Sequence, residues 1–167
     1  MSIKFLVALV VGFLALSVVA DDKIIPDFKN LAPEWSITGN GKIAEEDGFK
    51  YIKLEAPSEG VISGLAYKDI ALTGVKQVKI SLKYRTNVAV SSTHTGAWFL
   101  VGFKGAGADG KIKFDGLFLT SSKQWEKAEK TFNIPPSASA LWLELRLQEA
   151  RDGNVLDAGD ICIELKK

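Results

Sequence analysis

The residues with the richest chemistry in this sequence occupy alternate positions of one short stretch, ALWLELRLQEA (140–150). They are Trp142, Glu144, Arg146 and Gln148, which offer an aromatic ring, a carboxylate, a guanidinium and an amide. Residues two apart lie on the same face of a β-strand. A sugar has an apolar C–H face and a rim of hydroxyl groups, so its site combines a flat ring with planar donors and acceptors. These four side chains therefore predict a sugar-binding face, provided that the stretch is a strand.

The leucines between them favour a strand. Ala, Leu, Glu, Arg and Gln all favour helices, so propensity alone would make 140–150 helical. Leu141, Leu143, Leu145 and Leu147, however, recur at every second residue. A helix would scatter such leucines around its axis, whereas a strand points all of them to one side. We expect a strand with the leucines in the core.

Two further residues are expected to extend the sugar-binding face from neighbouring strands. Trp98 lies in GAWFLVGFK (96–104) and Arg85 in VKQVKISLKYRT (75–86), and NVAVSSTHTG (87–96) is expected to form a polar rim. An alternative stays open at this point: a loop covers Trp142, and Glu144 and Arg146 form an ordinary surface ion pair.

Catalytic patterns are missing from the sequence. The only histidine, His94, lies in a Ser- and Thr-rich stretch without a G-x-S-x-G motif, and it alone would have to serve as the base of a hydroxyl nucleophile. One histidine and one cysteine do not make a zinc or iron site unaided. No compact pair of carboxylates suggests glycoside hydrolysis. We therefore predict a protein that is not an enzyme and carries no cofactor.

A structural calcium ion is the one metal alternative. RDGNVLDAGD (151–160) contains several oxygen donors, of which Asp157 and Asp160 are the weak candidates for ligands. Their spacing does not match the EF-hand loop, so a solvated turn followed by a strand is the preferred interpretation.

Residues 1–20 read as a secretory signal peptide, with one early cation, an apolar run and small residues before Asp21. An uncleaved membrane anchor is the competing interpretation. Residues 21–167 then form a single domain, secreted or periplasmic, without a membrane contact once the signal is cleaved.

The domain carries no net charge, because Lys4 accounts for the single excess among 21 basic and 20 acidic residues. This balance argues against nucleic acid or an anionic membrane as the partner. The only cysteine, Cys162, is expected to be a small buried strand residue.

Short alternating segments separated by turn residues predict an all-β fold, a sandwich or barrel with almost no helix. GAWFLVGFK and KIKFDGLFLT are expected to form a hairpin across GAGADG (105–110), and 140–150 a second hairpin-like pair with 155–165.

The C-terminal half resembles the galactose-binding-like jelly-roll carbohydrate-binding modules. The likeness lies in Trp125 opening a strand, TFNIP (131–135), the alternating 141–147 segment, Gly153 and the closing Asp160-Ile161-Cys162-Ile163. In the N-terminal half, Trp35 and the KQVKISLKYRT strand match more loosely. The resemblance implies a single jelly-roll β-sandwich of about eight to ten strands and a carbohydrate ligand. It also implies that Trp35 and Trp125 are structural rather than ligand-facing.

Two departures from the family pattern stand out. Gly159-Asp160 replaces the usual paired aspartates of the closing strand, which counts against the family's structural calcium. The N-terminal N-G-x-F-E is reduced to IPDFKN (25–30), which keeps Phe28 but not the acid after it.

The leading hypothesis is a secreted, non-catalytic protein that binds a polysaccharide or glycan. The alternative is a secreted structural or protein-interaction domain that docks the same face onto a protein partner. A hydrolase with an unrecognised site ranks last.

Overall fold

The computed structural model describes residues 22–33, 35–56, 60–88 and 96–167. The predicted signal peptide, residues 1–20, lies outside these ranges, as do His94 and most of the expected polar rim. Among the described residues, no helix is long and apolar enough to cross a membrane.

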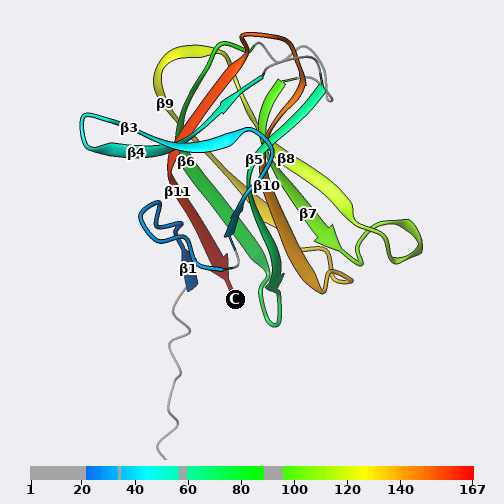
Figure 1. Ribbon diagram of the computed structural model, residues 1–167. Helices are drawn as coiled ribbons and strands as arrows, with labels where there is room; N and C mark the ends of the chain where they lie inside the picture. Colours follow the sequence, from blue (N-terminus) through cyan, green and yellow to red (C-terminus); the bar gives the residue numbers. More distant parts are fainter. Residues whose placement is uncertain (1–21, 34, 57–59, 89–95) are drawn as a thin grey trace, which may run out of the picture.

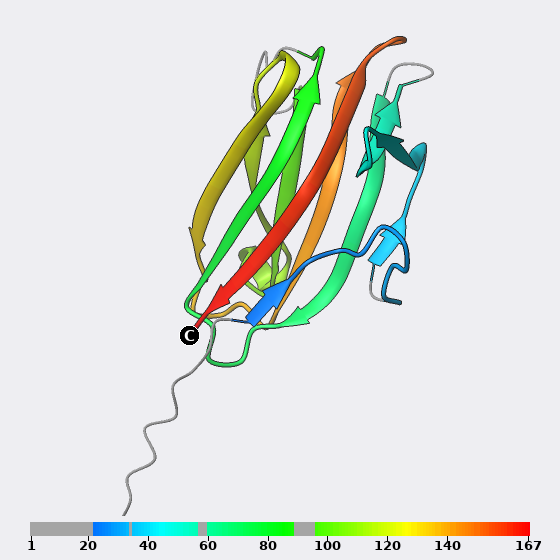
Figure 2. The ribbon, with the colours of Figure 1, turned by 90° about the vertical axis from the view of Figure 1, so that its left-hand side faces the viewer.

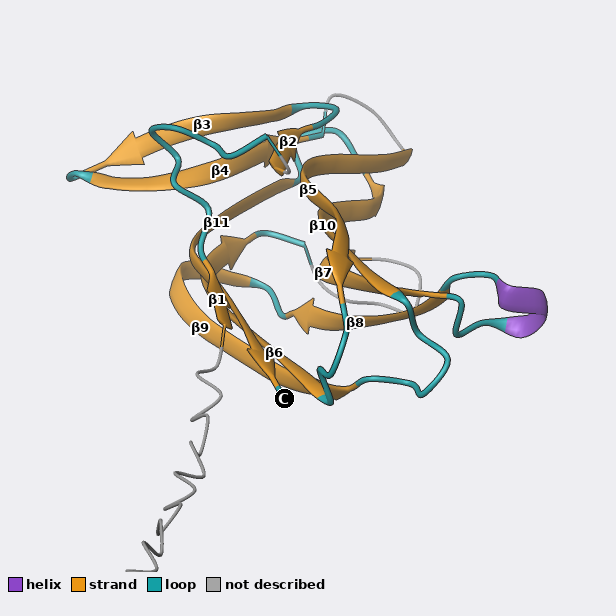
Figure 3. Cartoon of the chain, turned by 90° about the horizontal axis from the view of Figure 1, so that it is seen from below, coloured by secondary structure: helices purple, strands orange, loops and turns teal. Residues whose placement is uncertain are grey.

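Eleven strands make up the described chain, rather than the eight to ten expected. They are β1 (Asp22–Ile24), β2 (Trp35–Ile37), β3 (Gly41–Glu46), β4 (Phe49–Glu55), β5 (Gly60–Ala71), β6 (Gln77–Thr86), β7 (Gly96–Lys104), β8 (Lys113–Leu119), β9 (Ser122–Asn133), β10 (Ala140–Ala150) and β11 (Val155–Lys166). A single 3₁₀ turn, Ala108–Gly110, lies at the tip of the loop between β7 and β8 (Figure 3). The prediction of an all-β chain is confirmed.

The strands form two antiparallel sheets packed face to face (Figures 1 and 2). Sheet A has the order β3-β4-β11-β6-β9, with β1 also paired to β11. Sheet B has the order β2-β5-β10-β7-β8. The expected β7–β8 hairpin is present, with Trp98 opposite Phe118. The expected pairing of 140–150 with 155–165 is wrong, because β10 lies in sheet B and β11 in sheet A.

The core lies between the sheets and follows the alternation of the sequence. On β10, the four leucines at 141, 143, 145 and 147 have no exposed surface, and on β6 Val78 and Ile80 are equally buried. Trp35 is 6% exposed and packs edge to face on Tyr67, as its expected structural role requires. Burial of this kind stabilises each strand and fixes which way its other side chains point.

A β-bulge interrupts the alternation of β11. The register against β6 shifts between Gly159 and Cys162, and Asp160 has a positive φ of 48°. Inward residues are therefore even-numbered before the bulge, as at Ala158, and odd-numbered after it, as at Ile161. Cys162 consequently lies half-buried on the outer face, and the prediction that it is a buried residue is wrong.

Truncation of a β10 leucine tests this packing. Leu145→Ala should lower the free energy of unfolding by about 2 to 5 kcal/mol, because the side chain is fully enclosed and leaves a cavity. Guanidinium unfolding followed by circular dichroism measures the change, with the exposed Lys68→Ala as control. An effect no larger than that of the control would contradict the assignment of this leucine to the core.

Candidate functional site

The candidate site lies on the outer face of sheet B, the side of β10 opposite its leucines. Trp142, Glu144, Arg146 and Gln148 alternate with the buried leucines and so share this face. Across the β10–β7 ladder, Arg146 lies directly opposite Trp98. Five of the six predicted site residues are therefore brought together, and β10 and β7 run side by side in Figure 1.

Glu144 and Arg146 form the polar centre of this face. Arg146 Nη2 donates a hydrogen bond to Glu144 Oε2 at 2.5 Å, and Glu144 is only 6% exposed. The Arg146 guanidinium carbon lies 6.0 Å from the ring centroid of Trp98, within the range of a cation–π contact. Because two opposite charges are buried as a pair, the centre of the face is polar without a net charge.

Two aromatic pairs flank this centre. The rings of Trp98 and Phe118 are nearly parallel, with an interplanar angle of 8° and centroids 5.1 Å apart. Phe114 meets Trp142 edge to face, with centroids 5.8 Å apart. Phe114 and Phe118 are also the more exposed partners, at 52% and 39%. We call this surface the aromatic face. It consists of Trp98, Phe114, Phe118, Trp142, Glu144, Arg146 and Gln148.

Phe114 and Phe118 were not predicted from the sequence as site residues. The available signal was the spacing in KFDGLFL (113–119), where Phe114, Gly116 and Phe118 fall on one side of a strand. The shared side of these residues points to the candidate site only because β8 pairs with β7, and this pairing comes from the tertiary structure.

Two glycines let the rings lie close to the sheet. A Cβ on Gly116 would be 2.6 Å from Trp98 Cε3, and one on Gly102 would be 3.2 Å from Phe114 Cε1. Contacts of 2.6 Å are far inside van der Waals separation, so a side chain at 116 would displace the indole. The lack of a side chain at position 116 therefore leaves the space that the Trp98 ring occupies in its stack with Phe118.

Several polar atoms of the aromatic face have no hydrogen-bond partner among the described residues. They are Nε1 of Trp98, Nε1 of Trp142, Nε of Arg146 and Oε1 of Gln148. Buried polar atoms are normally paired, and an unpaired one is costly. Three donors and one acceptor just beneath one surface are suited to hydroxyl groups, which both donate and accept.

Arg85 does not belong to this site, and the prediction that it extends the face is wrong. It lies on β6 of sheet A, whose outer face is on the opposite side of the sandwich. Its Nε donates to Asp157 at 2.8 Å, its Nη2 pairs with Glu46 at 2.6 Å, and its guanidinium lies 4.7 Å from the Trp125 ring centroid. Tyr51 adds a 3.4 Å contact through its hydroxyl group.

This Arg85 cluster takes one residue from each strand of the β3-β4-β11-β6-β9 order. The hydrogen bond with Glu46, followed by that with Asp157, raises the pKa of Arg85 above its ordinary value. The guanidinium stays charged under all ordinary conditions. Arg85 and Trp125 therefore hold the strands of sheet A together, in agreement with the structural role expected for Trp125.

Gly116→Ala tests the platform. The added methyl group should push the Trp98 ring away from β8 and disturb its stacking on Phe118. We expect a changed near-ultraviolet circular dichroism spectrum and a shifted tryptophan emission, with the far-ultraviolet spectrum preserved. The matched control is Gly74→Ala, which meets no atom within 4 Å but lies at positive φ, so it reports backbone strain without a ring contact. Unchanged near-ultraviolet signals in Gly116→Ala would contradict the placement of the ring.

Comparisons with known proteins show similarity at the level of the fold. No protein-family model matches the chain, and no curated protein sequence matches it either. Among solved structures, it is similar to the family 22 xylan-binding module of Paenibacillus barcinonensis Xyn10C, with a TM-score of 0.56 and 18% identity over 89% of this chain and 97% of that one. The module TmCBM61, solved in complex with β-1,4-galactotriose, gives a TM-score of 0.53 and 12% identity over 80% and 90% of the two chains. A family 16 carbohydrate-binding module gives 0.56 and 15% over 78% and 88%.

The fold is thus the jelly-roll β-sandwich of carbohydrate-binding modules. This confirms the predicted fold class.

Proposed function

We propose that the protein is a secreted, non-catalytic module that binds a glycan across the aromatic face of sheet B. The observation that carries this proposal is the combination of the stacked Trp98–Phe118 pair with the Glu144–Arg146 ion pair, which has no net charge, on one surface. Residues 1–20 would direct the chain out of the cytoplasm, and no reaction is proposed.

The face suits a sugar because its two kinds of surface match those of a pyranose ring. The C–H face of a sugar would pack on the exposed rings, with Phe114 and Phe118 as outer edges of the platform. Its hydroxyl groups would hydrogen-bond the polar groups of Arg146 and Gln148, after small side-chain movements that bring these groups to the surface. The similar structures described as xylan-binding and as a β-1,4-galactotriose complex support a carbohydrate ligand.

The charge of the face favours an uncharged glycan. Arg146 is already neutralised by Glu144 at 2.5 Å, so it offers hydrogen bonds rather than a free positive charge. An acidic sugar would bring a carboxylate or sulfate toward Glu144, and like charges in a partly buried site repel each other. Neutral chains of the xylan or galactan type are therefore the expected class.

Affinity electrophoresis on a panel of soluble neutral polysaccharides tests the proposal. The wild type should be retarded by at least one polymer. Trp142→Ala should weaken the affinity about tenfold or more, because the loss of one aromatic contact of the binding face costs at least about 1 to 2 kcal/mol.

Trp125→Ala is the matched control for this experiment. Both tryptophans are half-buried on outer faces, but Trp125 lies on sheet A. Retention of binding in Trp125→Ala and its loss in Trp142→Ala locates the site, provided that both variants keep the far-ultraviolet spectrum of the wild type. Equal losses in two folded variants would count against the aromatic face.

Glu144→Gln tests the argument from charge. The substitution removes the negative partner of Arg146 and leaves the face with a net positive charge. We expect weaker retardation by the neutral polymer and new, salt-sensitive retardation by an acidic polysaccharide such as alginate. Unchanged preference between the two polymers would show that this ion pair does not set the ligand class.

A protein partner is the second candidate, favoured by the exposure of Phe114 and Phe118 on the edge strand β8. Exposed aromatic residues next to an arginine are also typical of protein–protein hot spots. Sedimentation over a range of concentrations separates the two functions: a dimer that is disrupted by Phe118→Ala, with no retardation by any polymer, would favour a protein ligand.

A further inference from the structure

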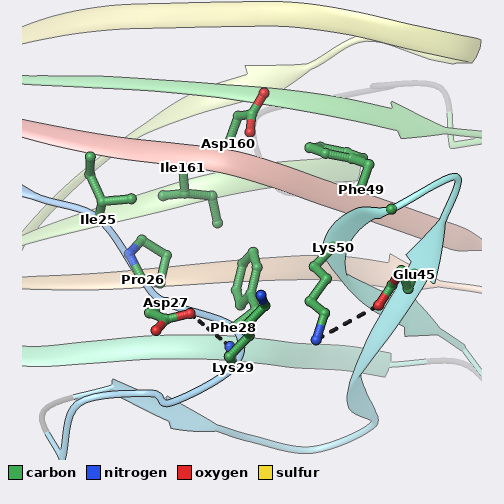
Figure 4. Close-up of a pocket in the computed structure, with 11 residues that line it drawn as sticks. Ile25, Pro26, Asp27, Phe28, Lys29, Glu45, Phe49, Lys50, Asp160 and Ile161 are labelled. Carbon is green, nitrogen blue, oxygen red and sulfur yellow. Dashed lines mark hydrogen bonds and ion pairs between the residues drawn. The ribbon is translucent and has the colours of Figure 1, made fainter.

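A hollow of about 600 Å³ lies beside β11 of sheet A (Figure 4). Its walls come from the segment after β1, from the turn between β3 and β4, and from the bulge of β11. Ile161, Phe28 and Phe49 supply apolar surface, and charged side chains such as Lys29 and Asp160 form the rim.

Both departures from the family's sequence pattern meet at this hollow. One is Lys29, which stands where the N-terminal pattern has an acid after the phenylalanine. The other is Gly159-Asp160, which stands where the closing strand usually has two aspartates. Phe28, Lys29 and Asp160 all line the same space, although they come from opposite ends of the domain (Figure 4).

The side chains around the hollow do not fit a calcium ion. Calcium takes six to eight oxygen ligands, several of them from carboxylates. Asp27 and Asp160 lie well apart in the hollow, with Ile161 and Phe28 between them (Figure 4). In the described part of the chain, no group of three or more acidic, histidine or cysteine side chains is placed to hold a metal ion.

Two of the three carboxylates that line the hollow already have a cationic partner, and the third, Asp27, accepts a hydrogen bond from the backbone N–H of Lys29. Asp160 pairs with Lys83 at 2.7 Å, and Glu45 with Lys50 at 3.7 Å. The second calcium candidate, Asp157, is held by Arg85 at 2.8 Å and does not line the hollow. A nearby ammonium or guanidinium group weakens the attraction of a carboxylate for a metal ion, because its positive charge opposes that of the ion.

We propose that lysine ammonium groups replace a structural metal in this chain. Lys83 neutralises Asp160 and thereby holds the strained bulge of β11, while Lys29 puts a positive charge where the related pattern has an acid. With two of its three carboxylates paired to lysines, the hollow lacks the oxygen ligands that a divalent cation needs, and the fold is stable without such an ion. This inference is independent of what the aromatic face binds.

Thermal unfolding of the wild type in metal-free buffer is the first test. The melting temperature should agree within about 1 °C in EDTA and in excess calcium, because a ligand that does not bind the native state does not stabilise it. A calcium ion at 100 times its dissociation constant would instead raise the melting temperature by about 5 to 10 °C. Such a rise, or a comparable loss in EDTA, would overturn the proposal.

A double variant tests the role of the lysines. Lys29→Glu combined with Lys83→Gln restores an acid beside Phe28 and releases Asp160. Calcium should raise the melting temperature of this variant by several degrees. The control, Lys68→Glu with Lys79→Gln, makes the same change in net charge at positions that do not line the hollow and should stay insensitive to calcium.

An unresponsive double variant would overturn the assignment of these lysines. If the double variant does not fold even with calcium, the single variant Lys29→Glu decides the question, since Lys29 is exposed and its replacement disturbs no core contact. Calcium should raise the melting temperature of Lys29→Glu measurably, whereas that of the wild type should not change. A complete lack of response in Lys29→Glu would likewise count against the proposal.

Discussion

The candidate site depends on the burial of one row of leucines. Leu141, Leu143, Leu145 and Leu147 have no exposed surface, and a slip of β10 by one residue would turn all of them to solvent. The free-energy cost of exposing these leucines keeps the alternate residues on the outer face of sheet B. These residues are Trp142, Glu144, Arg146 and Gln148. The same register places Trp98 of β7 opposite Arg146, so the core specifies the geometry of a surface that it does not touch.

The two outer faces of the sandwich carry similar side chains but differ in what these side chains contact. On sheet A, Arg85 lies among Glu46, Asp157 and Trp125, and ion pairs cross several of the strand boundaries. The aromatic rings of Trp125 and Tyr51 pack against the permanently charged guanidinium group of Arg85, and these contacts stabilise sheet A. On sheet B, Phe114 and Phe118 remain exposed. They lie on the same face as the ion pair of Glu144 and Arg146, which carries no net charge. Exposure of the rings and the pairing of the charges, rather than composition, distinguish the two faces.

Patterns within a single strand predicted the structure correctly, whereas the predictions that depended on strand pairing were wrong. The alternation of β6 and β10 predicted both strands and their inner faces, because one buried side is enough to fix parity. The predicted pairing of β10 with the following strand was wrong, since β11 lies in the other sheet, between β4 and β6. Arg85 was misplaced for the same reason: strand neighbours are set by topology, not by chain order.

By itself, the sequence determined an all-β chain, its strand faces and most of one candidate site, because period-two alternation and the cost of exposing leucines act within a single strand. Only the tertiary structure decided which strands share a sheet. It added Phe114 and Phe118 to the aromatic face, moved Arg85 to the opposite side and brought Lys29 and Asp160 to one hollow. These are contacts between distant segments, and their energies depend on packing across strands that no local pattern encodes.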